Sequence, residues 1–255
     1  MISEKEIRST KIEWTEKTWN PVTGCSKISA GCANCYAETM AKNFQSSGQF
    51  FKYRNGFEVT LHNHSLTDPL SWGKRSLIFV CSMGDLFHNE VPFEFIDKVI
   101  RVIESTPHHT YQILTKRAER MAEYFATRLV PRNAWLGVTV EVANAKSRID
   151  HLRKINAFTR FLSCEPLIED LGTLNLQGIN WVIVGGESVF SGYYKSRPMK
   201  KGWVLSIKEQ TDKQGAAFFF KQWGNVGSDG VVRSKTANGK ELDGKVYQAM
   251  PKPRR

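Results

Sequence analysis

Short apolar runs and stretches with helical spacing alternate along most of this sequence of 255 residues. The apolar runs predict strands at 20–24, 77–81, 111–114, 135–140, 158–163, 181–184 and 216–220. The stretches between them predict helices at 35–45, 92–103, 118–125, 143–155 and 199–214. Strands that alternate with helices in this way form a parallel sheet with helical crossovers. About seven such units predict the α/β class and a (β/α) barrel, partial and TIM-like, rather than an open doubly wound sheet.

Two segments do not follow this alternation. Residues 53–66 predict an inserted hairpin or a short strand. Residues 229–255 have little periodicity and predict a short hairpin or a loop that covers one end of the barrel. We therefore expect residues 1–228 to form the partial barrel with its small insertions, and residues 229–255 to form a tail or cap on the same domain.

Lysine and arginine outnumber aspartate and glutamate by 36 to 25, which gives a formal net charge of +11. This excess indicates a polyanionic partner, with nucleic acid as the first candidate, while a basic surface without a partner is the alternative. No apolar run approaches the ~18 residues of a membrane span, and residues 1–14 lack the apolar region of a signal peptide. We expect a cytoplasmic protein without a membrane partner, and structural disulfides are rare in that compartment.

Three of the five cysteines lie close together in the stretch 19–37, at Cys25, Cys32 and Cys35. Cysteines at this density indicate a metal or redox site. A structural zinc site has four ligands, which His62 or His64 would have to complete. Three cysteines on a [4Fe–4S] cluster leave one iron open to an outside ligand, as radical chemistry on S-adenosylmethionine requires. The spacing favours the cluster, with zinc and idle thiols as alternatives.

Polar groups follow every predicted strand, and a parallel barrel places its working groups at these carboxyl ends. Taken singly, each of these residues could equally cap a helix or solvate a loop. Taken together, they predict a ring of site residues around one end of the barrel. After the cysteine loop, the ring comprises 82–88, 115–117, 139–141, 163–166, 185–188 and 221–224.

The motifs Asn20-Pro21-x-x-Gly24-Cys25 and Gly31-Cys32-x-x-Cys35-Tyr36-Ala37 resemble the cluster loop of radical S-adenosylmethionine enzymes of the spore photoproduct lyase group. The departure is the six residues, 26–31, between the first two cysteines, where that group has three. With this longer spacing, the chain is similar to a phage- and mobile-element-associated family of radical S-adenosylmethionine-like proteins. The motifs that carry this second resemblance are those at 82–88, 114–117, 164–167, 185–188 and 221–224.

The resemblance implies that Cys25, Cys32 and Cys35 hold a [4Fe–4S] cluster whose fourth iron is capped by S-adenosylmethionine. It further implies a set of residues that bind S-adenosylmethionine: Asp85 for its amino group, Lys116 and Arg148 for its carboxylate, Thr115 and Thr139 as hydrogen-bond partners, and Glu141 for its ribose. Charge agrees with these roles, since a carboxylate pairs with Lys or Arg and an ammonium with a carboxylate. Tyr36 would pack beside the cluster or within a helix core.

On the substrate side, the resemblance implies that Glu187 and Lys221 face the substrate, together with Glu165 and Gln222. Cys164 is either a small buried residue or a cavity-facing donor of a hydrogen atom. The implied activity is that of a radical S-adenosylmethionine enzyme, in which a 5′-deoxyadenosyl radical attacks nucleic acid or a nucleotide in repair or modification. A reductant such as flavodoxin or ferredoxin would be the protein partner. The alternative is a nucleic-acid-binding or regulatory protein with a structural iron–sulfur or zinc site and no turnover.

Overall fold

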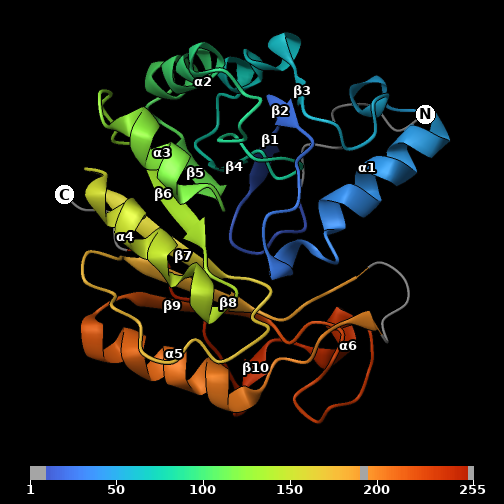
Figure 1. Ribbon diagram of the computed structural model, residues 1–255, viewed down its shortest axis with the longest axis vertical. Helices are drawn as coiled ribbons and strands as arrows, with labels where there is room; N and C mark the ends of the chain where they lie inside the picture. Colours follow the sequence, from blue (N-terminus) through green and yellow to red (C-terminus); the bar gives the residue numbers. More distant parts are fainter. Residues whose placement is uncertain (1–9, 190–194, 252–255) are drawn as a thin grey trace. The chain divides into compact units, whose positions relative to one another are not determined.

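The computed structural model describes residues 10–189 and 195–251. Its main sheet has seven strands in the hydrogen-bonded order β1 (Lys17–Trp19), β4 (Leu77–Val80), β5 (Thr110–Thr115), β6 (Ala134–Thr139), β7 (Thr159–Cys164), β8 (Trp181–Gly185) and β9 (Ala217–Gln222) (Figure 1). The order follows the chain without a reversal, and the pairs β1–β4, β4–β5, β7–β8 and β8–β9 are parallel. A doubly wound sheet would reverse its order, whereas this order is that of a barrel left open between its edge strands β1 and β9. The predicted α/β partial barrel is confirmed.

The chain divides into two compact units. The first unit comprises the described part of Met1–Ser26, with Ala37–Leu136 and Ile155–Phe158. The second comprises Lys27–Tyr36, Gly137–Lys154 and the described part of Thr159–Arg255.

The first unit contains most of α1 (Tyr36–Ser47) and all of α2 (Phe93–Ser105) and α3 (Ala118–Phe125). Helix α2 begins directly after Pro92, whose fixed φ suits a helix start. Apolar residues three and four positions apart give α2 one buried face, made of Phe95, Ile96, Val99, Ile100 and Ile103. Burying each such side chain contributes roughly 1.5–3 kcal/mol.

The second unit contains α4 (Ser147–Lys154), α5 (Lys201–Gln214), the short α6 (Lys235–Asn238) and the hairpin of β10 (Glu241–Leu242) and β11 (Lys245–Val246). Helix α5 packs against β9 (Figure 1) and ends at Gly215, whose φ of 75° is the left-handed conformation that glycine adopts at low cost. After the hairpin, the chain returns along β9, where Phe220 N donates to Tyr247 O (2.7 Å) and Ala249 N to Phe218 O (3.1 Å). A hairpin was one of the two structures predicted for this tail.

Turns of 3-10 helix complete the described elements: η2 (Ala30–Cys32), η3 (Phe51–Tyr53), η4 (Asn63–Ser65), η5 (Asp68–Ser71) and η6 (Ala143–Lys146). Residues 143–155, predicted as one helix, form η6 followed by α4. None of the helices in 10–189 and 195–251 has the length and apolar character needed to cross a membrane.

A short strand is present within the predicted segment 20–24, but it is not part of the parallel sheet. The first strand of the parallel sheet is Lys17–Trp19, and the predicted segment 20–24 instead contains β2 (Val22–Thr23), which pairs antiparallel with β3 (Thr60–Leu61). In β1 only Trp19 is buried, because this strand lies at the edge of the sheet, so it has no apolar run that a sequence pattern could detect. The short strand predicted within 53–66 is confirmed as β3.

Candidate functional site

The three clustered cysteines have half-buried, reduced side chains. Cys25 belongs to the first unit and follows Gly24, whose φ of 85° no other residue adopts easily and whose added Cβ would lie 2.1 Å from the Glu58 carbonyl oxygen. Cys32 and Cys35 belong to the second unit, and Cys32 ends the turn η2. Residues 25–35 are called the cysteine loop below.

In the first unit, Arg117 connects the cysteine loop to the end of β4. Its Nη1 lies 3.2 Å from Asp85 Oδ2 and donates to Cys25 Sγ at 3.4 Å. Its Nη2 donates to the backbone oxygen and the hydroxyl of Ser26, at 3.2 and 2.9 Å. The side chains of Arg117 and Asp85 are each 8% exposed, so water screens this ion pair weakly. The guanidinium favours negative charge on the Cys25 sulfur.

The carboxylate of Asp85 accepts hydrogen bonds from several groups of its own unit. Phe87 N donates to Oδ1 at 2.9 Å, and the Thr115 hydroxyl lies 2.7 and 2.9 Å from the two carboxylate oxygens. The backbone N–H of Lys116 lies 3.4 Å from Oδ2. The ends of β4 and β5 therefore bring together three of the predicted cofactor-binding residues, Asp85, Thr115 and Lys116.

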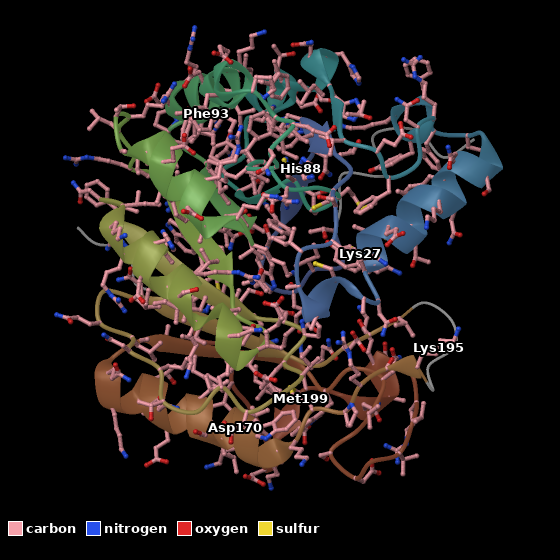
Figure 2. All side chains as sticks on the ribbon, viewed as in Figure 1. Lys27, His88, Phe93, Asp170, Lys195 and Met199 are labelled. Carbon is pink, nitrogen blue, oxygen red and sulfur yellow. The ribbon has the colours of Figure 1, made fainter. Side chains whose placement is uncertain are left out.

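His88 continues this network beyond Arg117 (Figure 2). Its Nδ1 accepts a hydrogen bond from Glu90 N (3.2 Å), so Nε2 carries the proton and donates to Ser26 Oγ (2.8 Å). Burial, followed by the nearby charge of Arg117, lowers the pKa of His88 below its ordinary value. The imidazole is therefore neutral at pH 7 and supports the loop as a hydrogen-bond donor.

In the second unit, Glu141 at the end of β6 supports the next part of the loop. Its side chain is fully buried and accepts hydrogen bonds from Ser29 Oγ and from Arg148 Nη1, the latter at 2.8 Å. Arg148 Nη1 also donates to the Thr139 carbonyl at 2.7 Å. An added Cβ at Gly31 would lie 2.7 Å from Glu141 Cγ, so the loop backbone packs directly on this side chain. Thr139, Glu141 and Arg148, all predicted to bind S-adenosylmethionine, are brought together here.

Glu187, just after β8, holds the last part of the loop. Its Oε2 accepts from Arg197 N (2.9 Å), Arg197 Nε (3.1 Å) and Asn34 Nδ2 (3.0 Å), and Arg197 Nη2 donates to Oε1. Arg197 Nη1 donates to the Ala30 carbonyl at 2.9 Å. Burial raises the pKa of Glu187, but the hydrogen bonds from Arg197 and Asn34 outweigh burial and leave that pKa below its ordinary value. Asn34 also donates to the carbonyl of Lys195, labelled in Figure 2.

The remaining predicted site residues form a separate set at the ends of β7 and β9. Lys221 Nζ lies 2.6 Å from Glu165 Oε2, and Ser163 Oγ donates to Glu165 Oε1 at 3.3 Å. Cys164 is fully buried, and burial raises the pKa of its thiol, which favours its interpretation as a core residue. Gln222 is buried and donates to the Gly186 carbonyl at 3.0 Å. Tyr36, the first residue of α1, is exposed.

Two arginines that contact the cysteine loop had no predicted role. Arg117 belongs to the motif at 114–117, and its position beside Lys116 at a strand end could have indicated a role. Arg197 lies 167 residues from Ala30 in the sequence, in a segment without a periodic pattern, so no local signal pointed to it.

The cofactor fit can be tested on the chemistry of the donors. The cysteine loop has three reduced thiols. A guanidinium contacts the sulfur of Cys25, and the hydroxyl of Ser29 lies 3.6 Å from the sulfur of Cys32. These donors suit the anionic, thiolate-ligated [4Fe–4S] cluster. Within 10–189 and 195–251, no three His, Cys, Asp or Glu side chains are already gathered around one metal position. The donor set thus fits the cluster by its chemistry. Cys25 lies in the first unit, and Cys32 and Cys35 lie in the second.

Comparison with solved structures finds spore photoproduct lyase. A complex of that lyase with dinucleoside spore photoproduct has a TM-score of 0.49 and 12% sequence identity, and the match covers 84% of this chain and 65% of the lyase chain. A mutant of the lyase with bound AdoMet and dinucleoside spore photoproduct gives the same four values. The chain therefore spans less than two thirds of the length of these lyase chains.

Comparison with curated protein sequences finds no match. A family model described as "Protein of unknown function (DUF5131)" matches residues 9–251, which is nearly the whole chain. The chain belongs to the DUF5131 family.

Proposed function

We propose that this protein is a radical S-adenosylmethionine enzyme that binds a [4Fe–4S] cluster through Cys25, Cys32 and Cys35. One observation carries the proposal: charged residues at or near the carboxyl ends of three strands support the cysteine loop within each unit. Asp85 with Arg117 supports Cys25, Glu141 with Arg148 supports Ser29, and Glu187 with Arg197 supports Ala30 and Asn34. Carboxyl ends are where parallel barrels build their active sites.

A cluster held by Cys25, Cys32 and Cys35 would supply one electron to cleave the sulfonium of S-adenosylmethionine. The chain's own residues orient the ligand and keep water out. Asp85 is the candidate for the amino group, Lys116 and Arg148 for the carboxylate, and Glu141 for the ribose. Asp85 and Glu141 each already accept a hydrogen bond from an arginine. A ligand group that binds either carboxylate would therefore replace an existing hydrogen-bond partner.

The proposed substrate is nucleic acid or a nucleotide, and the net charge of +11 is the support for it. Lys221, paired with Glu165, is the candidate cation for a substrate phosphate. A cytoplasmic location and a flavodoxin- or ferredoxin-type reductant complete the proposal, because a low-potential cluster has to be reduced before it can donate an electron.

Anaerobic reconstitution with iron and sulfide tests the cluster. We expect about four iron and four sulfide ions per chain, and an electron paramagnetic resonance signal of the reduced protein that changes when S-adenosylmethionine is added. Replacing Cys25, Cys32 or Cys35 by Ala should abolish the signal. Cys81→Ala is the matched control, because Cys81 is buried outside the cysteine loop and should leave the iron content unchanged.

The enzyme and the alternative differ in turnover. The enzyme releases 5′-deoxyadenosine after reduction, whereas a nucleic-acid-binding protein with a structural cluster retains iron and releases none, with or without DNA. A protein that binds zinc and takes up no iron would contradict the proposal.

A further inference from the structure

We propose that Glu187 and Arg197 form a clamp that positions the segment Lys27–Tyr36, and that Glu187 therefore acts as a positioning residue and not as a catalytic carboxylate. The proposal rests on the proposed function in one respect, which is that this segment carries the two cluster ligands Cys32 and Cys35. The clamp itself is a property of the chain without a cofactor. It changes the role that the sequence resemblance gives Glu187, which was to face the substrate.

The clamp holds the segment at two points. Arg197 Nη1 donates to the carbonyl of Ala30, in the same turn as Cys32. Asn34, the residue before Cys35, donates to Glu187 Oε2. The contact at Ala30 lies before Cys32, and the contact at Asn34 lies between Cys32 and Cys35. Together they hold the part of the loop that carries both sulfurs.

The carboxylate of Glu187 is enclosed by the groups that it binds. Its two oxygens accept four hydrogen bonds, three of them from Arg197 and one from Asn34. Its side chain is 3% exposed, so a substrate has no access to it. Oε2 accepts three of these bonds, and Oε1, which accepts one, is enclosed with the rest of the side chain. A general base needs a free lone pair within reach of the proton that it accepts.

All three nitrogens of the Arg197 guanidinium also have partners. Its Nε and Nη2 bind Glu187, and its Nη1 binds Ala30, so the fork geometry of the guanidinium sets the distance between the end of β8 and the loop. Charge-assisted hydrogen bonds of this kind are about twice as strong as neutral ones. A lysine at this position would supply the charge without the fork.

Arg153 is a matched control in the same unit. Its Nη1 pairs with Asp150 at 2.6 Å, and its Nε and Nη2 donate to the carbonyls of Gln177 and Asn175 at 3.1 and 2.9 Å. Its side chain is 27% exposed, compared with 31% for Arg197. It thus makes the same kinds of bond, to a carboxylate and to loop carbonyls, without touching the cysteine loop.

Hydrogen exchange on the iron-free protein tests the clamp independently of any cofactor. We expect Arg197→Ala to raise amide exchange in the peptide 27–36 about tenfold, because the anchor at Ala30 is lost and Glu187, which anchors Asn34, loses its guanidinium partner. Arg153→Ala should leave exchange in that peptide at the wild-type rate. Arg197→Lys should fall between the wild type and Arg197→Ala. Unchanged exchange in 27–36 for Arg197→Ala, or an equal rise for Arg153→Ala, would overturn the proposal.

Glu187→Gln separates positioning from catalysis. A Gln side chain keeps an oxygen that accepts from Asn34 and Arg197 but cannot act as a base. We expect Glu187→Gln to retain more than half of the wild-type iron and the spectral response to S-adenosylmethionine after reconstitution, and Glu187→Ala to lose both. If Glu187→Gln loses iron as fully as Glu187→Ala, the geometric role of Glu187 is refuted. If the wild type itself takes up no iron while Arg197→Ala still loosens 27–36, the proposed function fails and the clamp stands.

Discussion

At the scale of single residues, the site is built from carboxylates that are each paired with an arginine. Asp85, Glu141 and Glu187 are all buried, and each is stabilised by a guanidinium. Removing one partner from a buried pair leaves an uncompensated charge, which costs far more than the intact pair contributes. These arginines should therefore matter for folding as well as for the cysteine loop.

Arg117→Ala tests this at a pair in which both side chains are buried. Both side chains are 8% exposed, so we expect a loss of about 3 kcal/mol in the free energy of unfolding, measured with urea. Arg128→Ala is the control, because the side chains of Arg128 and Asp97 are 33% and 27% exposed and this substitution should cost clearly less than Arg117→Ala. Equal losses for the two variants would contradict the role of burial.

The lowered pKa of His62, in the first unit, predicts that the stability of the protein depends on pH. Burial, followed by the charges of Lys52 and His64, lowers its pKa from 6.5 to about 4, and its Nε2 lies 2.8 Å from the Thr23 hydroxyl. The unfolded chain then binds more protons than the folded chain between about pH 4 and 6.5, so stability falls as the pH falls through that window.

We expect wild-type protein to lose on the order of 1–3 kcal/mol through this residue between pH 7 and pH 4, by urea unfolding. His62→Gln should show a smaller loss over the same range. An identical pH dependence in the variant would show that other groups dominate.

At the scale of elements, strands with apolar runs were predictable and the contacts that position the loop were not. The run at 181–184 predicts β8 closely, because a strand buried on both faces needs apolar residues throughout. The edge strand β1 has one buried residue and gave no such signal. Arg117 and Arg197 act through side-chain geometry that sequence spacing does not contain.

The close approach of the ends of β8 and β9 gives an element-scale prediction. A Cβ at Gly186 would lie 1.8 Å from the backbone oxygen of Trp223, so Gly186→Ala has to push the two segments apart. We expect a loss of about 2 kcal/mol or more in the free energy of unfolding. Gly202→Ala, within α5, meets nothing within 4 Å and should gain about 0.5–1 kcal/mol from helix propensity. Similar values for the two variants would contradict the close approach.

At the scale of the whole molecule, the excess of basic residues is the property that the proposed substrate depends on. A net charge of +11 attracts any polyanion, so binding alone does not distinguish a specific partner from a general one. The salt dependence of binding is more informative, because each phosphate contacted releases counterions and adds to the slope. The slope therefore counts how many phosphates the protein engages.

We expect the iron-free protein to bind a DNA oligonucleotide, with an affinity that falls about a hundredfold between roughly 50 and 200 mM salt if about four phosphates are contacted. Fluorescence anisotropy with a labelled single strand and a labelled duplex measures both slopes. Lys221→Ala should lower the slope by about one if this residue contacts a phosphate, and Arg153→Ala should leave it unchanged. An affinity that is independent of salt, or no binding at 50 mM, would remove nucleic acid as the substrate and leave a small molecule or peptide as the target of the radical chemistry.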